Sequence, residues 1–194
     1  RQNILYQKSI KKGKEIAYFK DIEFSRIFMA WKNPFCKDQK NILGYEIISS
    51  ILTDGRNSVL NRCLKEDEQI VESIYSGIQP GEFGSLFIIE ASLKRENLQE
   101  VENIINNLLQ KLSSNTNLTN KIKKAIRIVK SNYVFNVETS SNLSYFYGNH
   151  LLWGRLNPQI ELSNNLKYWE SIGNLNKLIK YLLKDNFTFI AHNK

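Results

Sequence analysis

The sequence predicts an α+β domain in which helices pack on one face of a mixed, mostly antiparallel sheet. Three observations lead to this fold class. Two segments with strand-like patterns lie within residues 15–31, and two more flank a Pro-Gly turn. Most of the second half has the apolar periodicity of helices. Because strands and helices do not alternate regularly, a doubly wound parallel sheet is disfavoured. With 194 residues, 42% of them hydrophobic, the chain can bury one full-sized core.

Two β-type runs lie within residues 15–31. The second is apolar on both sides of the alternation over Ile27–Trp31, which is typical of a central strand. Asn33-Pro34 ends it. Residues 1–14 are polar and basic, so we expect a linker or lead-in there, followed by a single domain over residues 15–194.

A helix is predicted over Asp38–Thr53, where apolar residues cover too much of the circumference for a helix lying alone on the surface. Asp54-Gly55 ends this helix. Ser58 is placed to cap a short helix that carries Val59, Leu60, Cys63 and Leu64. The first of these helices is therefore expected to lie inside the domain.

Two further strands are predicted over Ile70–Ile78 and Phe83–Leu93. They flank a Pro80-Gly81 turn and should pair as a hairpin. Near the end of the chain, Phe187–Ala191 alternates like an edge strand or a closing strand.

The residues between the hairpin and the last strand are mostly helical by pattern. Leu98–Leu112 carries a clean apolar stripe. A polar loop follows, with Thr119 or Asn120 as the N-cap of the next helix. The other expected helices run from Lys121 towards Trp153, with a bend near Thr139–Asn142, over Leu162–Ile172, and from an N-cap at Asn174.

The formal charge of +8 favours acidic partners. Part of the excess lies in one helical segment, at Lys121, Lys123, Lys124, Arg127 and Lys130. Apolar residues follow the other side of that segment, so a solvated helix face is favoured over a nucleic-acid surface, which is the lesser alternative. No apolar run approaches the roughly 20 residues that span a bilayer, and no membrane partner is expected.

Few residues could carry chemistry. A catalytic zinc site needs about three protein ligands, but the chain has only His150 and His192, far apart in sequence. For His150, near a helix end, a capping or surface role is favoured. Cys36 and Cys63 fit neither a disulfide framework nor a metal knuckle and are expected to be small, half-buried hydrophobes. Neither histidine is expected to bind zinc.

Other catalytic motifs are missing as well. There is no G-x-S-x-G elbow, no Walker loop and no G-x-G-x-x-G fingerprint. The acidic cluster Glu66, Asp67 and Glu68 lies in a polar patch and is expected to be solvated rather than to hold a metal. The sequence therefore offers no self-contained active site.

Taken in order, several short segments resemble one repeat of the insulinase-like zinc metallopeptidases, the pitrilysin and mitochondrial processing peptidase type. Each motif is short, but together they cover about residues 15–190. They are Phe24–Trp31 before Asn33-Pro34; Ile51–Leu60, similar to "iLGgg..SrL"; Leu64-Lys65-Glu66, similar to "LRE"; Ile70–Ser76, similar to "LAYSVS"; Gly81–Ile89, similar to "d.G.f.i"; Lys121–Val129, similar to "eLe.AK" with Ala125 on the alanine; and Tyr181–Leu183 before Asp185-Asn186, similar to "yL...n".

The resemblance implies a family in which active repeats carry H-x-x-E-H and a zinc-bound water attacks the peptide bond. This chain has no H-x-x-E-H, so it resembles an inactive, C-terminal-type repeat, with no cofactor of its own and with zinc in the parent protein or a partner subunit. In some relatives an arginine and a tyrosine of this repeat contact substrate. The matching positions here hold Val59 and Glu72, and both depart from the pattern.

The sequence leaves three functions open. The first is a non-catalytic domain that encloses the peptide substrate beside a catalytic domain or subunit, with peptide held by backbone pairing at a strand edge. The second is a structural or assembly module with no role in proteolysis, and the third is a nucleic-acid binder. Because the chain opens at Arg1 without a methionine, we expect it to be a segment of a longer protein.

Overall fold

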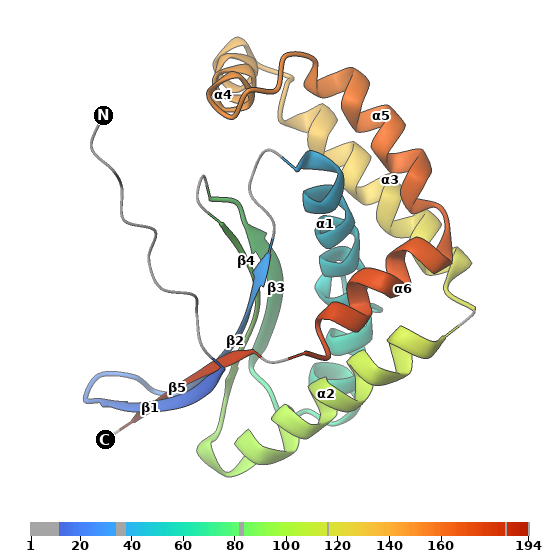
Figure 1. Cartoon of the computed structure of the whole chain (residues 1–194). Coiled ribbons are helices and arrows are strands. Elements are labelled where there is room, and N and C mark those ends of the chain that lie inside the picture. The colour runs from blue at the N-terminus through green and yellow to red at the C-terminus, as the bar shows by residue number, and fades with distance from the viewer. Residues whose placement is uncertain (1–11, 34–37, 82–83, 116, 185, 194) are drawn as a thin grey trace.

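The computed structural model describes residues 12–33, 38–81, 84–115, 117–184 and 186–193 (Figure 1). Cys36 lies outside these residues. The elements follow one another as β1 (Gly13–Phe19), β2 (Ser25–Asn33), α1 (Gln39–Thr53), the π-helical turn η1 (Asn61–Asp67), β3 (Ser73–Gln79), β4 (Ser85–Leu93), the 3₁₀ turn η2 (Arg95–Asn97), α2 (Leu98–Ser114), α3 (Thr119–Phe135), α4 (Ser140–Leu152), α5 (Pro158–Trp169), α6 (Ile172–Tyr181) and β5 (Phe187–Asn193).

The five strands form one mixed sheet in the order β1-β5-β2-β4-β3. Only β1 and β5 run parallel, while β2 pairs antiparallel with both β4 and β5, and β3 pairs antiparallel with β4. The predicted hairpin is therefore confirmed. Among the described strands, β1 and β3 are the two edge strands of the sheet.

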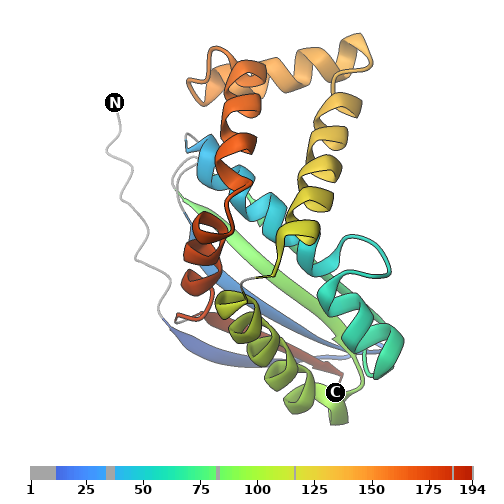
Figure 2. The same ribbon diagram turned by 90° about the vertical axis from the view of Figure 1, so that its right-hand side faces the viewer.

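Helices cover one face of this sheet, and α4 extends beyond its end (Figures 1 and 2). Ile27, Met29 and Trp31 of β2 point into the core and are almost fully buried. Opposite them on β4 lie Ala91, Ile89 and Phe87. The predicted α+β class with helices on one face is confirmed. Fully burying one large apolar side chain of this kind stabilises a fold by about 1.5–3 kcal/mol.

Helix α1 lies in the middle of the domain, as its broad apolar pattern predicts. It contacts β3 on the sheet side and α3, α5 and α6 on the outer side. Asp38 caps its start by accepting a hydrogen bond from the N–H of Asn41 at 3.1 Å. A helix enclosed in this way is usually apolar all round. The charged Glu46 of α1 is an exception, because it lines a groove.

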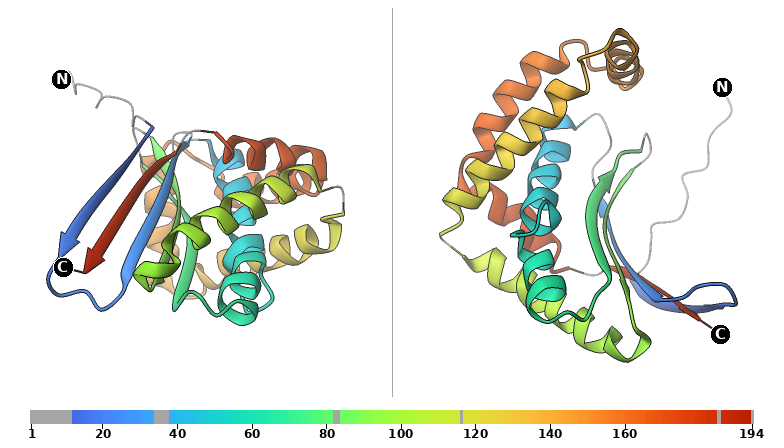
Figure 3. Two further views of the ribbon diagram at one scale, coloured as in Figure 1. Left: turned by 90° about the horizontal axis from the view of Figure 1, so that it is seen from below. Right: turned by 180° about the vertical axis from the view of Figure 1, so that it is seen from behind.

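The opposite face of the sheet carries no helix of the described residues (Figure 3). Phe28 of β2 and Phe189 of β5 lie there, half-buried, with ring centroids 6.2 Å apart. Next to them the guanidinium of Arg26 lies 3.8 Å from the Glu90 carboxylate. This face is therefore a mixture of apolar and paired charged side chains.

Several expectations about element ends are wrong. The helix expected from Lys121 towards Trp153 is two helices, α3 and α4, separated by residues 136–139. Helix α3 begins after Leu118 without a side-chain cap, so neither Thr119 nor Asn120 is its N-cap, and α6 begins after Ser171 rather than Asn174. Local pattern finds such helices but fixes their ends poorly.

The position predicted for the last strand is also wrong. Its alternating pattern favours an edge or closing strand. Strand β5 lies inside the sheet, between β1 and β2. Its pairing with β1 joins residues more than 170 positions apart, such as Gly13 and Phe187. No local signal specifies such a partner.

The cationic side of α3 faces solvent. All five of its predicted basic residues are exposed, whereas Ile122, Ala125 and Val129 on the other side are buried. In the described part of the chain, no helix is both long and apolar enough to cross a bilayer.

Candidate functional site

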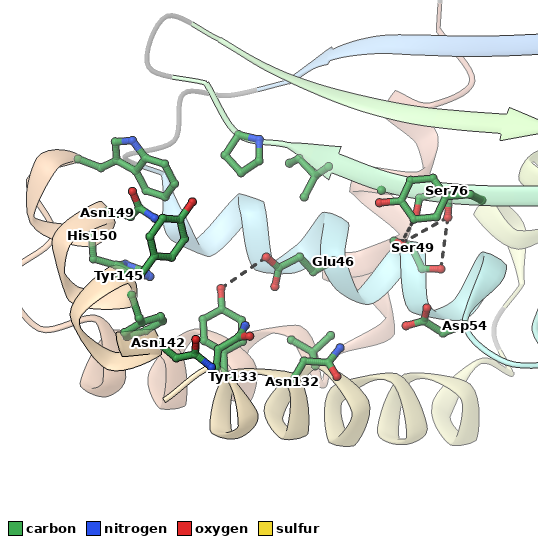
Figure 4. Close-up of a pocket in the computed structure, with 18 residues that line it drawn as sticks. Glu46, Ser49, Asp54, Ser76, Asn132, Tyr133, Asn142, Tyr145, Asn149 and His150 are labelled. Atoms are coloured by element: carbon green, nitrogen blue, oxygen red, sulfur yellow. Dashed lines mark hydrogen bonds between the residues drawn. The ribbon is translucent and has the colours of Figure 1, made fainter. Parts of the chain in front are cut away.

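A groove of ≈ 540 Å³ runs between β3 and α3, with α1 as its floor and α4 at one end (Figure 4). Its volume lies in the range of ligand-binding clefts. One side of the groove is β3, which is an edge strand among the described strands of the sheet.

The groove is lined by aromatic rings, asparagine amides and two carboxylates. The aromatic residues are Tyr75, Tyr133, Tyr145, Phe146 and Trp153, and the amides are Asn132, Asn136, Asn142 and Asn149. The carboxylates belong to Glu46 and Asp54, and no Lys or Arg is among the described residues that line the groove. In a chain of net charge +8, the described lining thus carries carboxylates and polar amides, and the nearby cation whose charge reaches Glu46 is Arg155.

Glu46 lies at the centre of the groove. It projects from α1 towards Tyr133 of α3, whose hydroxyl donates to Oε1 at 3.5 Å (Figure 4). Burial raises the pKa of the Glu46 carboxyl to about 7, although the hydrogen bond from Tyr133 and the charge of Arg155 both lower it. Burial also raises the pKa of Tyr133, so its hydroxyl keeps its proton. Near neutral pH, Glu46 is poised between its charged and neutral forms.

His150 forms the α4 end of the site. Its ring lies 4.3 Å from the Phe146 ring, centroid to centroid, and its Nδ1 is 3.4 Å from Nη1 of Arg155. The side chain is buried, which corrects the expectation of a capping or surface role. Burial, aided by the positive charge of Arg155, lowers its pKa to about 4. His150 is therefore neutral at pH 7.

Helix α4 is held across the end of the groove by a turn on each side. Thr139 caps its start, with Oγ1 accepting from the N–H of Asn142 at 3.1 Å. After the helix, Gly154 adopts a positive φ of 74°, a conformation that favours glycine. The N–H of Arg155 then donates back to the carbonyl of His150 at 2.8 Å. Between these two turns, α4 contributes Asn142, Tyr145, Phe146, Asn149 and His150 to the lining of the groove.

The opposite end of the groove is a hydroxyl network between α1 and β3. The Ser76 N–H donates to Oγ1 of Thr53 at 3.0 Å, and Oγ of Ser49 donates to the Ser76 carbonyl at 2.7 Å. Both backbone groups of Ser76 are thus satisfied by α1 side chains. The edge of the sheet is therefore bonded to α1 at Ser76.

The described residues do not fit a zinc ion. His150 lies on α4, and His192 lies on β5, where its Nδ1 is 2.8 Å from Oγ of Ser25. Within the described ranges, no three His, Cys, Asp or Glu side chains form a set that could hold a metal. The acidic cluster belongs to the surface, with Glu66 paired to Arg56 at 2.6 Å and Asp67 3.8 Å from Arg62. No metal chemistry is assigned to these side chains.

The two positions matched to the substrate-contacting pair lie outside the groove. Val59 precedes η1 and packs partly buried against the core. Glu72 is exposed just before β3 and donates its backbone N–H to the Ser92 carbonyl at 2.8 Å. Cys63 is partly buried, with a raised thiol pKa that reflects burial first and the nearby carboxylates of Glu68 and Asp67 second.

Sequence reasoning missed the residues that form the groove. They come from α1, β3, α3 and α4, so no local motif contains them. One signal was available, because Glu46 is a carboxylate flanked by Tyr45, Ile47 and Ile48 in an otherwise apolar helix. A lone acid in a buried stripe is a candidate site residue.

Comparison with known proteins identifies the family. The profile described as the peptidase M16 inactive domain matches residues 3–127, which is more than half of the chain. No curated protein sequence matches. Among solved structures, a protease from Helicobacter pylori superposes with a TM-score of 0.76 at 19% identity, covering 92% of this chain and 43% of that one.

Two further structures have the same fold. A peptidase M16 inactive domain from Pseudomonas fluorescens superposes with a TM-score of 0.78 at 13% identity, covering 95% of this chain and 44% of that one. The inactive peptidase domain of a candidate zinc protease from Bordetella parapertussis superposes with a TM-score of 0.72 at 10% identity, covering 90% of this chain and 96% of that one. The chain thus spans less than half the length of the Helicobacter pylori and Pseudomonas fluorescens chains. It belongs to the M16 peptidase inactive-domain family, as its resemblance to the insulinase-like peptidases implies.

Proposed function

We propose that the chain is the non-catalytic, substrate-enclosing domain of a zinc metalloendopeptidase, with zinc and the H-x-x-E-H motif on another domain or subunit. The observation that carries this proposal is a peptide-sized groove along the edge strand β3, in a family of inactive domains. The proposed domain comprises residues 15–194. It would hold an extended peptide while a neighbouring catalytic centre cleaves it.

The face of the sheet without a described helix is a candidate surface for a partner of this domain. Phe28 and Phe189 lie on that face, and the described helices all lie elsewhere. Half-buried aromatic residues on a sheet face without packed helices are typical of a surface that another domain or subunit covers. We assign this surface to the catalytic domain or subunit of the same peptidase.

Hydrolysis by the parent protein tests this function. The parent is expected to cleave a fluorogenic peptide, to lose that activity on chelation and to regain it with zinc. The isolated 194-residue chain is expected to leave the same peptide intact at every zinc concentration. Cleavage by the isolated chain would contradict the assignment.

The alternative is a structural or assembly module of the same fold. The observation that favours it is the departure at Val59 and Glu72, neither of which lines the groove. A parent protein that assembles correctly, lacks H-x-x-E-H throughout and cleaves no peptide would establish this alternative. An intact H-x-x-E-H in the parent, together with zinc-dependent cleavage, would exclude it.

A further inference from the structure

We propose that the β3–α3 groove recognises a positively charged side chain of the bound peptide, with Glu46 as the counter-charge. This inference rests on the proposed function, because it names what the peptide presents to the groove. It assigns a binding role to Glu46 and to the aromatic residues around it.

The first argument is the charge of the lining. Glu46 and Asp54 line the groove, and none of the chain's 27 Lys and Arg is among the described lining residues. Asparagine side chains contribute amide oxygens, which accept hydrogen bonds. The neutral His150 adds no positive charge. A guanidinium or ammonium group, which carries only donors, complements such a lining.

The second argument is the arrangement of aromatic rings. Tyr75 on β3 is 60% exposed, and Tyr145 on α4 is 76% exposed. Together with Trp153 and Glu46, they belong to the lining of the same groove. The face of an aromatic ring attracts a cation, by about 0.5–1 kcal/mol at exposed sites and more when water is excluded.

The third argument is the environment of the Glu46 carboxyl and its effect on ionisation. Its carboxyl has a pKa raised to about 7, so burial outweighs the stabilisation of its charge by Tyr133 and Arg155. A ligand cation beside the carboxylate would supply the missing compensation. The side chain is also positioned for a ligand, since it is half-buried at the groove floor and the hydrogen bond from Tyr133 to its carboxylate is long, at 3.5 Å.

The test is the equilibrium binding of a matched set of peptides to the 194-residue chain. The probes are fluorescein-labelled pentapeptides of alanine and glycine with arginine, citrulline or leucine at the centre, measured by anisotropy at pH 8. Citrulline keeps the shape of arginine, but a carbonyl oxygen replaces one guanidinium nitrogen, so the charge and two of the five N–H donors are lost. Because the whole chain is positively charged, its overall field repels arginine, and a preference for arginine therefore reports a local site.

We expect the arginine peptide to bind at least about 10-fold more tightly than the citrulline peptide, a difference of about 1.4 kcal/mol. Glu46→Gln is expected to reduce this preference to within about twofold, whereas Glu100→Gln, on the exposed side of α2, is expected to retain it. A second readout needs no variant. In the unsubstituted chain the preference should fall as the pH is lowered from 8 to 5.5, because Glu46 then takes up a proton.

Equal binding of the arginine and citrulline peptides would overturn cation recognition while leaving peptide enclosure standing. A preference that survives both Glu46→Gln and acidification would overturn the role of Glu46. If none of the three peptides binds, this proposal fails, whereas the enclosing function is judged separately by the zinc-dependent activity of the parent protein.

Discussion

Oγ1 of Thr53, in the last turn of α1, accepts a hydrogen bond at 3.0 Å from the backbone N–H of Ser76 in β3. Oγ of Ser76 lies 2.9 Å from the same Thr53 oxygen, and both residues are buried. A helix side chain therefore takes the place of a neighbouring strand at this point of the sheet edge. The contact fixes the distance between the groove floor, α1, and its β3 side.

Thr53→Val should destabilise the domain, because valine keeps the shape but leaves the Ser76 N–H without its acceptor. The expected loss in the free energy of unfolding is about 1–3 kcal/mol. Thr53→Ser retains the hydroxyl and should lose less. Urea unfolding of the three proteins measures both effects. Equal stability of the valine variant and the original chain would show that the bond contributes nothing.

Gly44 lies where α1 packs most closely against the outer helices. A methyl group there would lie 2.5 Å from Cδ1 of Leu178 and 2.6 Å from Cζ2 of Trp169. Gly44→Ala should therefore destabilise the domain, by about 1–3 kcal/mol, although alanine favours a helix. Gly148→Ala on α4, with open space around the added methyl, is the matched control and should stabilise by about 0.5–1 kcal/mol. Thermal unfolding compares the two, and a gain for both would contradict this packing.

Ionisation of Glu46 should cost stability as the pH rises. The pKa of this carboxyl is about 7 in the folded state, above its ordinary value. Between about pH 4.5 and 7 the unfolded chain therefore holds fewer protons at this site than the folded chain, and the free energy of unfolding falls. Glu46→Gln removes this loss and should be more stable than the original chain at pH 8, by on the order of 1–2 kcal/mol, but not at pH 5. Unfolding at both pH values measures the difference; a variant less stable at pH 8 would refute it.

His150 should titrate in the opposite direction. Its folded-state pKa, lowered to about 4, lies below the ordinary value of 6.5. As the pH falls through this window the unfolded chain binds a proton that the folded chain does not, and stability is lost. Proton NMR of the imidazole ring measures the pKa directly. A midpoint near 4 is expected, and a midpoint near 6.5 would mean that the ring is not buried against Phe146.

The elements that the sequence predicts well are those with a strong local period. Ile27–Trp31 reads as a central strand and lies in β2, between β5 and β4. The stripe over Leu98–Leu112 becomes α2, and the broad apolar pattern over Asp38–Thr53 becomes the enclosed α1. In each case one segment carries both the pattern and the burial that follows from it.

What the sequence could not supply depends on contacts between distant segments. The burial of His150 arises from Phe146 and Arg155 once the turn at Gly154 folds back. Glu46 and Tyr133 approach one another only when α1 and α3 pack together. Periodicity reports which face of an element is apolar, but not which other element covers it.

The central claim is that this domain is a peptide-binding domain without a zinc site of its own for peptide hydrolysis. Measurement of zinc in the purified 194-residue chain, after incubation with excess zinc and exhaustive dialysis, tests it most directly. The account predicts far less than one zinc per chain. One tightly bound zinc per chain, lost only to a strong chelator, would contradict it.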